Sequence, residues 1–588
     1  MAVHESMKLH VTPDKFYIVA TDTVENEVLV IDRISQDISL HRNEDIVPRN
    51  VEVKNIYGLF GIIHLLAGPY LLVITKRVKV GEISGQSIYK VTGTEMLCYK
   101  RTQFHLNEKQ VQDNTRYVAM VEHVLAMDSF YFCTTYDITH TMQRLYNTSP
   151  DFVRMPLHER ADVRFVWNNS MIREFAQQEE LSQYCLPVML GFVEVRSCIA
   201  KGHAFQYIVI SRRCSFRAGT RYYMRGVDSE GHAANFVETE QIVEYGSTRS
   251  SFVQTRGSVP LYWYQYPNLK YKPAPIISTL QNQNDAFQRH FAAQIYNYGK
   301  QVLINLLDQK GHEQNLVNNY SAQVQAAQNS NIRYVPFDFH KECKKMRWDR
   351  LSLLLDQISE DQASFGYFLI NGGQVEATQD GVFRTNCIDC LDRTNVVQSL
   401  LARRSLQAQL QMFGILSAQE RVEDQVMLET AFKNVWADNA DACSKQYAGT
   451  GALKTDFTRT GRRTKIGLVR DGVNSLVRYV LNNFYDGFRQ DSIDLFLGNY
   501  VVEEAEDVSK PCPLRDEKDW KYYALPVIFL VAFSMCVISI LIPDEHVSEQ
   551  VMYILFWGGS SAVTMAMMYF YGREFVDRPK LAQKLKIE

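Results

Sequence analysis

The stretch RTNCIDCLDRTN, residues 384–395, places two cysteines, two aspartates and two arginines within twelve positions. The residues just before it, GVFR at 381–384, have the composition of a short buried strand. The residues after it, TNVVQSLLARRSLQAQLQMF from position 394, repeat their apolar members at helical spacing. The sequence therefore predicts a strand, a tight loop and a helix, which is the frame of an α/β domain.

The spacing C-x5-R-T, formed by Cys387, Arg393 and Thr394, predicts a nucleophile that acts on a phosphate. A five-residue loop that enters a helix can turn its N–H groups around a tetrahedral oxyanion and favour a thiolate. The arginine can bind two phosphate oxygens and stabilise the transition state, and the threonine hydroxyl can donate to the sulfur. Asp389 or Asp392 can act as general acid and then as general base. This chemistry requires neither a metal nor a cofactor.

Other interpretations of Cys387 are open at this point. Cys387 and Cys390 form a CxxC pair, which is typical of half a zinc site or of a redox pair, although no second CxxC is present. A buried structural cysteine is also common. Of the eleven cysteines, only Cys387 has an arginine six positions later. Phosphatase chemistry is therefore the favoured interpretation, with Cys390 as a hypothetical reversible disulfide partner.

The overall composition sets few limits on the fold and the function. The chain has 588 residues, a net charge of −3 and 46% hydrophobic residues, which allows two or three domains with sizeable cores. The eleven cysteines lack the spacing of a disulfide framework, which indicates a reducing compartment. The N-terminus lacks the pattern of a cleavable signal peptide. No nucleic-acid-binding motif is present, so we expect no nucleic-acid partner.

The soluble part divides into two predicted domains. Residues 1–180 contain alternating and β-branched runs and predict a β-rich N-terminal subdomain. Residues 181–500 mix strand-like and helical segments and predict an α/β catalytic domain, in which 286–307 is the clearest helix. The apolar run from Tyr57 is broken by Gly68 and Pro69, which favours two buried strands joined by a turn.

The C-terminal region predicts a membrane anchor. Residues 524–542 and 551–571 carry no charge, and each is close to the ~20 residues that a membrane-spanning helix needs. The predicted segments are an acidic flexible tether at 501–521, a first transmembrane helix at 522–542, a lumenal turn at 543–550, a second transmembrane helix at 551–571 and a cytosolic tail at 572–588.

Basic residues flank both spans on their outer sides, which places both termini in the cytosol. The chain ends KLKIE, and Lys584 and Lys586 resemble the dilysine signal that retrieval-coat machinery reads. The expected location is therefore the membrane of the endoplasmic reticulum and the Golgi.

The stretch RTNCIDCLDRTN resembles the signature of the Sac-domain phosphoinositide phosphatases. Long blocks between about 120 and 490, such as RGSVPLYW at 256–263 and YVPFDFHKECKKMRWDR at 334–350, are similar to further blocks of that family. The double span and the lysine tail resemble the family's integral-membrane members of the endoplasmic reticulum and Golgi. The resemblance implies a β-rich subdomain packed on a catalytic domain. It also implies hydrolysis of phosphatidylinositol monophosphates, chiefly the 4-phosphate and also the 3-phosphate.

Three basic clusters are candidates for contact with an anionic lipid in the cytosolic leaflet. Internal ion pairs or a solvated face are the alternative for each of them. The first cluster is Arg212, Arg213, Arg217, Arg221 and Arg225; the second is Lys341, Lys344, Lys345 and Arg347; the third is Lys454, Arg459, Arg462, Arg463 and Lys465.

Two other functions compete with a phosphoinositide phosphatase. A protein tyrosine phosphatase would use the same loop, but it usually takes its acid from a separate aspartate loop. A non-enzymatic phosphoinositide-binding tether would not need Cys387, Arg393 and Thr394 together.

Overall fold

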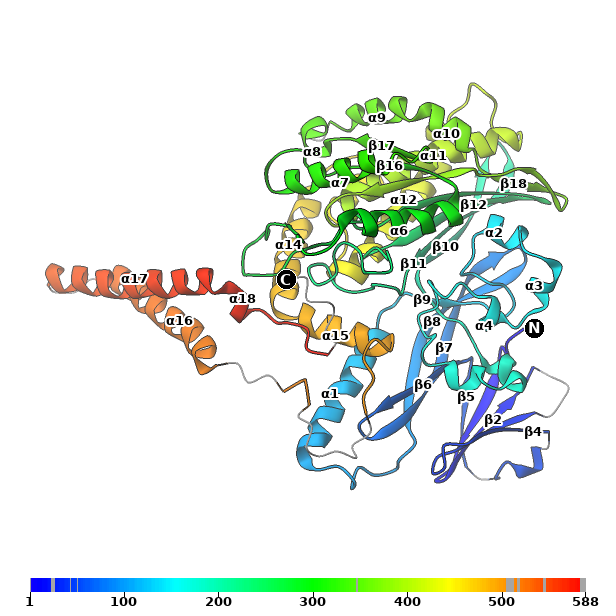
Figure 1. The fold of residues 1–588 in the computed structure, drawn as a ribbon, viewed down its shortest axis with the longest axis horizontal. Helices are drawn as coiled ribbons and strands as arrows, with labels where there is room; N and C mark the ends of the chain where they lie inside the picture. Colours follow the sequence, from blue (N-terminus) through cyan, green and yellow to red (C-terminus); the bar gives the residue numbers. More distant parts are fainter. Residues whose placement is uncertain are drawn as a thin grey trace.

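The computed structural model describes residues 2–22, 27–42, 44–49, 51–344, 347–503, 512–515, 519–542 and 546–581. Figure 1 shows a body of sheets and helices from which a pair of helices projects to one side. An antiparallel N-terminal sheet lies at one end of this body. Its strands, in spatial order, are β4 (Ile38–His41), β3 (Val28–Asp32), β2 (Lys15–Ala20), β1 (Met7–Val11) and β5 (Glu52–Ile56).

A larger sheet runs through the rest of the body, and its apolar strands are paired side by side. Its main path is β17 (Ile332–Pro336), β16 (Lys300–Asn305), β20 (Gly381–Asn386), β13 (Thr248–Arg256), β12 (Val237–Tyr245), β11 (His203–Arg213), β10 (Met189–Ala200), β9 (Phe130–Phe132), β8 (Gln86–Cys98), β7 (Gly68–Ile83) and β6 (Leu59–Leu65).

The strands β6 and β7 confirm that the apolar run from Tyr57 forms two strands joined by a turn. The sheet is continuous across residue 180, because β9 pairs with both β8 and β10. The continuous sheet does not mark a boundary at this point. The division into two domains near residue 180 stays a prediction. Helix α1 (Glu108–Leu125), which the sequence analysis did not predict, packs on this half of the sheet through residues such as Tyr117 and Val121.

The parallel part of the sheet has helices on both faces. Strand β20 runs parallel to β16 and β13, and β16 runs parallel to β17. Leu303 packs toward α6 (Gln283–Tyr298) and α7 (Gln314–Ala327), whereas Val302 and Ile304 pack toward the opposite face. Because these strands are parallel, their carboxyl ends meet at one edge of the sheet, where the segments after β16, β17 and β20 come together.

The opposite face is covered mainly by α9 (Leu351–Gln357) and α11 (Asp392–Met412). Helix α11 confirms the helix predicted after residue 394, and β20 confirms the strand before the loop. The remaining helices of this part are α8 (Phe339–Glu342), α10 (Ser359–Phe365), α12 (Val426–Ala448), α13 (Thr455–Thr460), α14 (Lys465–Phe484) and α15 (Asp486–Phe496).

The prediction of one helix over 286–307 is wrong in its second half. Helix α6 ends at Tyr298, and residues 300–305 form β16. Gly299 has a φ of 73°, a conformation that ends the helix and favours glycine. The following residues, QVLI, are buried on both faces of the sheet, so tertiary packing decides their structure.

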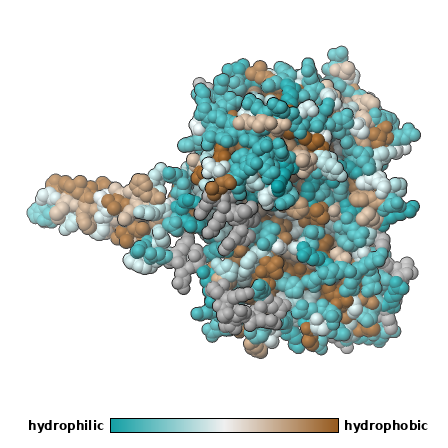
Figure 2. All heavy atoms as spheres, in the orientation of Figure 1, coloured by the Kyte–Doolittle hydropathy of each residue, from teal (hydrophilic) through white to brown (hydrophobic). Residues whose placement is uncertain are grey.

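The two projecting helices correspond to the predicted spans. Helices α16 (Trp520–Leu541) and α17 (Val547–Phe570) are long and apolar enough to cross a membrane and are almost unburied, which is compatible with a membrane anchor. Figure 2 shows largely hydrophobic residues on this hairpin and mostly hydrophilic ones on the body. Part of the predicted tether, the residues 543–545 of the turn, and Lys584 and Lys586 lie outside the described residues.

The chain returns to the body after α17. This return segment, residues 572–581, begins with α18 (Gly572–Phe575) and then packs against α15. The Asp577 carboxylate accepts a hydrogen bond of 2.8 Å from the Phe488 N–H, and the Asp491 carboxylate accepts one of 2.9 Å from the Leu581 N–H. Val576 and Leu581 are buried. The predicted cytosolic tail is therefore, up to residue 581, part of the folded body.

We expect Leu581→Ala to destabilise the body, because it removes a buried side chain from the core that α1, α15 and β6–β9 share. Loss of a buried leucine costs about 2–4 kcal/mol. Thermal unfolding of the full chain in detergent measures the effect. Leu280→Ala is the control, since Leu280 is 71% exposed. Equal melting temperatures for both variants would show that the return segment does not contribute to stability.

Candidate active site

The cysteine loop, residues 387–393, lies at the carboxyl edge of the parallel strands. β20 ends at Asn386, Cys387 follows at once, and α11 begins at Asp392. Cys387 is only 3% exposed, and the Thr394 hydroxyl donates to its sulfur at 3.5 Å. This hydrogen bond is the one expected of a threonine that supports a thiolate.

The carbonyl groups of the loop are bound from its outer side. Arg225 donates to the Ile388 carbonyl at 2.8 Å, and the Asn235 amide donates to the Asp389 carbonyl at 3.0 Å. The Cys390 thiol donates to the carbonyl of Cys387 at 3.3 Å. In a trans peptide the carbonyl and the next N–H point in opposite directions, so the N–H groups of 388–390 face the inside of the loop. Together with the N-terminus of α11 they form a cradle for an anion.

Arg393 lies at the mouth of the loop and is held by acidic residues that follow β16. Its guanidinium donates to the Leu306 carbonyl at 2.9 Å and to the Asp308 carboxylate at 3.0 Å. It also forms an ion pair of 3.2 Å with Glu313. Burial alone would lower the Arg393 pKa, but Cys387, Glu313 and Asp308 outweigh it and raise that pKa. The guanidinium is therefore a permanent cation in this position.

Asp389 is clamped between two arginines. Arg221 and Arg225 approach its carboxylate at 2.8 Å and 2.7 Å. Burial would raise the Asp389 pKa, but the two guanidinium groups dominate and hold that pKa far below its usual range. Asp389 is thus ionised at neutral pH and has no proton to donate.

The pKa of Asp392 is shifted in the opposite direction to that of Asp389. Burial raises its pKa against the opposing influence of Arg478 and of the Leu453 N–H, which donates to its carboxylate at 2.8 Å. Of the two aspartates in the loop, Asp392 is thus the one whose surroundings favour a bound proton. The surroundings shift the pKa values of two aspartates in opposite directions, although the sequence alone left the two equivalent.

Cys390 is oriented away from this chemistry. Its φ of 53° turns the chain sharply, and its thiol donates to the Gly257 carbonyl at 2.9 Å. Burial, and then the neighbouring Cys387, raise the Cys390 pKa to about 12, so the thiol stays protonated and exchanges slowly with disulfides.

Among the described residues, no group of three or more His, Cys, Asp and Glu side chains is arranged to hold a metal ion.

The first basic cluster is internal. Arg212 is fully buried and forms ion pairs of 2.9 Å with Glu238 and 2.6 Å with Glu240. Arg221 and Arg225 support the cysteine loop through Asp389. These arginines therefore bind the protein itself rather than an external lipid.

The other two basic clusters lie side by side near the loop. The Trp348 ring, which follows the second cluster, stacks on the Phe457 ring of α13 with centroids 5.1 Å apart. Arg459 and Arg463 are ion-paired with aspartates and are partly buried. Lys345 lies outside the described residues. The exposed members of the two clusters are Lys341, Lys344, Arg347, Lys454, Arg462 and Lys465.

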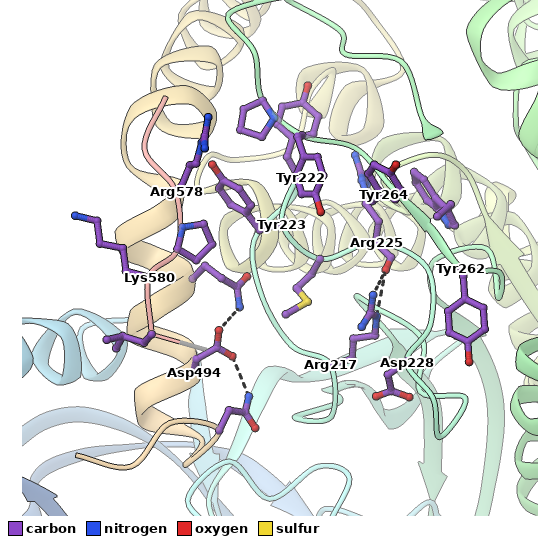
Figure 3. Close-up of a pocket in the computed structure, with 18 of the residues that line it drawn as sticks. Arg217, Tyr222, Tyr223, Arg225, Asp228, Tyr262, Tyr264, Asp494, Arg578 and Lys580 are labelled. Carbon is purple, nitrogen blue, oxygen red and sulfur yellow. Dashed lines mark hydrogen bonds between the residues drawn. The ribbon is translucent and has the colours of Figure 1, made fainter. Parts of the chain in front are cut away.

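A cavity of about 750 Å³ lies behind the loop, between the return segment and residues 217–228. Figure 3 shows Arg217 and Arg225 on one side of it and Arg578 and Lys580 on the other. Arg225 joins the two regions, because the same side chain lines the cavity and holds the loop carbonyl of Ile388. Cys387 is not among the lining residues, so the cavity is separate from the cradle.

Several residues of the site were missed in the sequence. Asp308 and Glu313 hold Arg393, and Arg478 and Asn482 of α14 lie beneath the loop, where the Asn482 amide oxygen accepts a hydrogen bond of 3.1 Å from Arg221. The acidic pair follows a buried strand at the carboxyl edge of the sheet, which is a recognisable signal once β16 is assigned correctly. No local pattern indicates the two residues on α14.

We expect Asp389→Ala to destabilise the protein strongly, because it leaves Arg221 and Arg225 without their shared carboxylate. Breaking a buried ion pair from one side costs about 3–5 kcal/mol. Thermal unfolding measures the loss, with Asp349→Ala as the control. The pair of Asp349 with Arg347 is exposed and contributes about 1 kcal/mol or less. A melting temperature that is the same for both variants would contradict this account of the clamp.

Comparisons with known proteins show the family of the chain. The model of the SacI homology domain matches residues 57–344. Phosphatidylinositol-3-phosphatase SAC1-A of Danio rerio is 54% identical over 100% of this chain and 99% of its own length. The proteins named phosphatidylinositol-3-phosphatase SAC1 in Drosophila melanogaster and Saccharomyces cerevisiae are 44% and 38% identical over 99% and 91% of this chain, and over 97% and 86% of their own lengths. Identity of this extent over the full length shows common descent, and the chain belongs to the Sac-domain phosphoinositide phosphatase family.

Proposed function

We propose that this protein is a membrane-anchored phosphatase that removes phosphate from phosphatidylinositol monophosphates through a phosphocysteine on Cys387. The observation that carries the proposal is the geometry of the loop. The sulfur of Cys387 receives the Thr394 hydroxyl, and the loop N–H groups point inward, with Arg393 at the mouth. A phosphate monoester is the ligand that such a cradle fits.

In the first step the thiolate of Cys387 attacks phosphorus, and the bond from phosphorus to the inositol oxygen breaks. Arg393 binds equatorial phosphate oxygens, and the phosphate competes with Glu313 for the guanidinium. Asp392 donates its proton to the leaving inositol oxygen. Asp389 acts only by fixing the loop, because it is held ionised between two arginines.

In the second step the phosphocysteine is hydrolysed. The Asp392 carboxylate takes a proton from water, the water oxygen attacks phosphorus, and the sulfur leaves as a thiolate. The Thr394 hydroxyl supports the departing thiolate by its hydrogen bond. Inorganic phosphate is released, and the enzyme returns to its initial protonation state without a metal or cofactor.

The lipid substrate is supported by the relatives and by the local charge. Several relatives are named phosphatidylinositol-3-phosphatase or phosphoinositide phosphatase. The preference for the 4-phosphate, with the 3-phosphate as a further substrate, rests on the resemblance of the sequence blocks. The exposed lysines and arginines near residues 341–347 and 454–465 are the proposed contacts of an anionic headgroup, because they are close to one another and free of burial.

The membrane anchor is the hairpin of α16 and α17. The flanking basic residues favour both termini in the cytosol, so the enzyme acts on the cytosolic leaflet of the endoplasmic reticulum and Golgi. The retrieval coat is the proposed partner of Lys584 and Lys586.

We expect Cys387→Ser to abolish phosphate release from phosphatidylinositol 4-phosphate while lipid binding is retained. The measurement is phosphate release by the full chain in detergent, in the presence of EDTA, from each phosphoinositide and from a phosphotyrosine peptide. Cys390→Ser is the matched control and should keep activity, because its thiol only donates to carbonyl groups. Turnover of phosphotyrosine alone would assign the chain to the tyrosine phosphatases. Turnover that survives Cys387→Ser would exclude the phosphocysteine.

The activity should also depend on the protonation of Asp392. Because the raised pKa belongs to an acid that must be protonated, kcat should fall as pH rises through that pKa, at a higher pH than an ordinary aspartate would give. Asp392→Asn should remove this descending limb and slow the reaction about 100-fold or more. A pH profile of kcat for both proteins tests the assignment. An unchanged descending limb in Asp392→Asn would place the acid elsewhere.

A further inference from the structure

Helix α14 presents its polar side chains to the protein and its apolar side chains to the outside. Arg478 and Asn482 are buried, whereas Ile466, Val469 and Leu476 are 81%, 68% and 65% exposed. A surface helix of a water-soluble domain buries its apolar stripe and exposes its polar one. The orientation of α14 is therefore the reverse of what contact with water would select.

Hydrogen bonds on the inner face fix this orientation. The Arg478 guanidinium donates to the Thr450 hydroxyl and to the Gly451 carbonyl, each at 3.0 Å. Asp471 accepts a hydrogen bond of 3.1 Å from the Lys454 N–H. Turning the helix to bury its apolar face would leave these charged groups without partners, which is costly in a protein interior. The hydrogen bonds of the inner face therefore keep the apolar face of α14 pointing outward.

The outward stripe is continuous over the whole helix. It consists of Ile466, Val469, Val473, Leu476, Val480 and Phe484, all of them exposed. Lys465 and Arg470 are also exposed along the same helix. An apolar stripe with basic residues beside it is typical of a helix that lies in the boundary between headgroups and acyl chains.

The position of α14 indicates which apolar phase covers it. Figure 1 shows α14 on the side of the body from which α16 and α17 project, with its axis running across the direction of the hairpin. The Leu269 N–H donates to the Asn483 side chain of α14 at 3.1 Å, and the ammonium group of Lys270 lies 4.8 Å from the Tyr569 ring of α17. One loop therefore joins α14 to the base of the hairpin.

We propose that the outer face of α14 inserts into the surface of the membrane that the hairpin spans. The proposal rests on the membrane anchor of the proposed function. The ligand of this face is the cytosolic leaflet itself, with acyl chains against the stripe and anionic headgroups near Lys465 and Arg470.

This contact also places the cysteine loop at the lipid surface. The Asn482 amide oxygen accepts a hydrogen bond from Arg221, which binds Asp389 of the loop. The Leu453 N–H, just before α13, binds Asp392. Arg221 thus connects the loop to the inner face of a helix whose outer face, in this proposal, contacts lipid. The enzyme accordingly acts on headgroups of its own membrane.

Photo-cross-linking tests the insertion without relying on catalysis. The full chain is placed in phosphatidylcholine vesicles that contain phosphatidylserine, with a benzophenone amino acid at Leu476 or, as the control, at Met412. Met412 is 57% exposed, and it ends α11 about 30 Å from the cysteine loop. We expect lipid adducts from position 476 and none from 412. Adducts to another polypeptide, or equal lipid adducts from both positions, would overturn the proposal.

A substitution experiment separates membrane docking from the chemistry. The triple variant Val469→Glu, Val473→Glu and Leu476→Glu should lower turnover of bilayer phosphatidylinositol phosphate at least tenfold. It should leave turnover of a soluble short-chain analogue unchanged, and Met412→Glu should alter neither. An equal loss on both substrates would give α14 a purely structural role and overturn the proposal.

Failure of the proposed function is distinguishable from failure of this inference. If the unmodified chain turns over neither substrate, the lipid cross-link at position 476 still decides whether α14 inserts. If alkaline carbonate extracts the chain from the vesicles, the membrane anchor itself is wrong, and the insertion of α14 into the hairpin's membrane fails with it.

Discussion

The clamp of Arg221 and Arg225 on Asp389 is the interaction on which the site depends. It binds the loop through the Asp389 carboxylate, and Arg225 also holds the Ile388 carbonyl outward. Because Arg225 binds that carbonyl from outside the loop, the next N–H is turned to the inside, where the proposed phosphate would lie. Preorganisation of this kind removes the free-energy cost of ordering the donors during the reaction.

The same clamp connects the cradle to the rest of the molecule. Arg221 also donates to Asn482 of α14, and Arg225 lines the cavity beneath the return segment. The cysteine loop, helix α14 and the return segment thus share two arginines. A perturbation of any of them acts on the position of Ile388 and Asp389.

Local patterns predicted the strand, loop and helix around Cys387 and the two apolar helices, because each depends on neighbours in the sequence. They could not separate Asp389 from Asp392, since the difference comes from Arg221, Arg225 and Arg478, which lie far away along the chain. The helix predicted over 286–307 was wrong because the residues after Gly299 are buried in a sheet, and burial overrides helical spacing. The packing of the return segment depends on contacts between Asp491 and residues 90 positions later, which no local signal reveals.

The return segment shows how the hairpin is connected to the folded body. The chain leaves the body after α15, passes through α16 and α17, and then buries Leu581 in the core that α1, α15 and β6–β9 share. The hairpin is therefore an insertion within one folding unit and not an appendage to a finished domain. During synthesis the residues that complete the core emerge after both apolar helices. The core of the body is therefore completed only after both apolar helices have been synthesised, because Leu581 belongs to it.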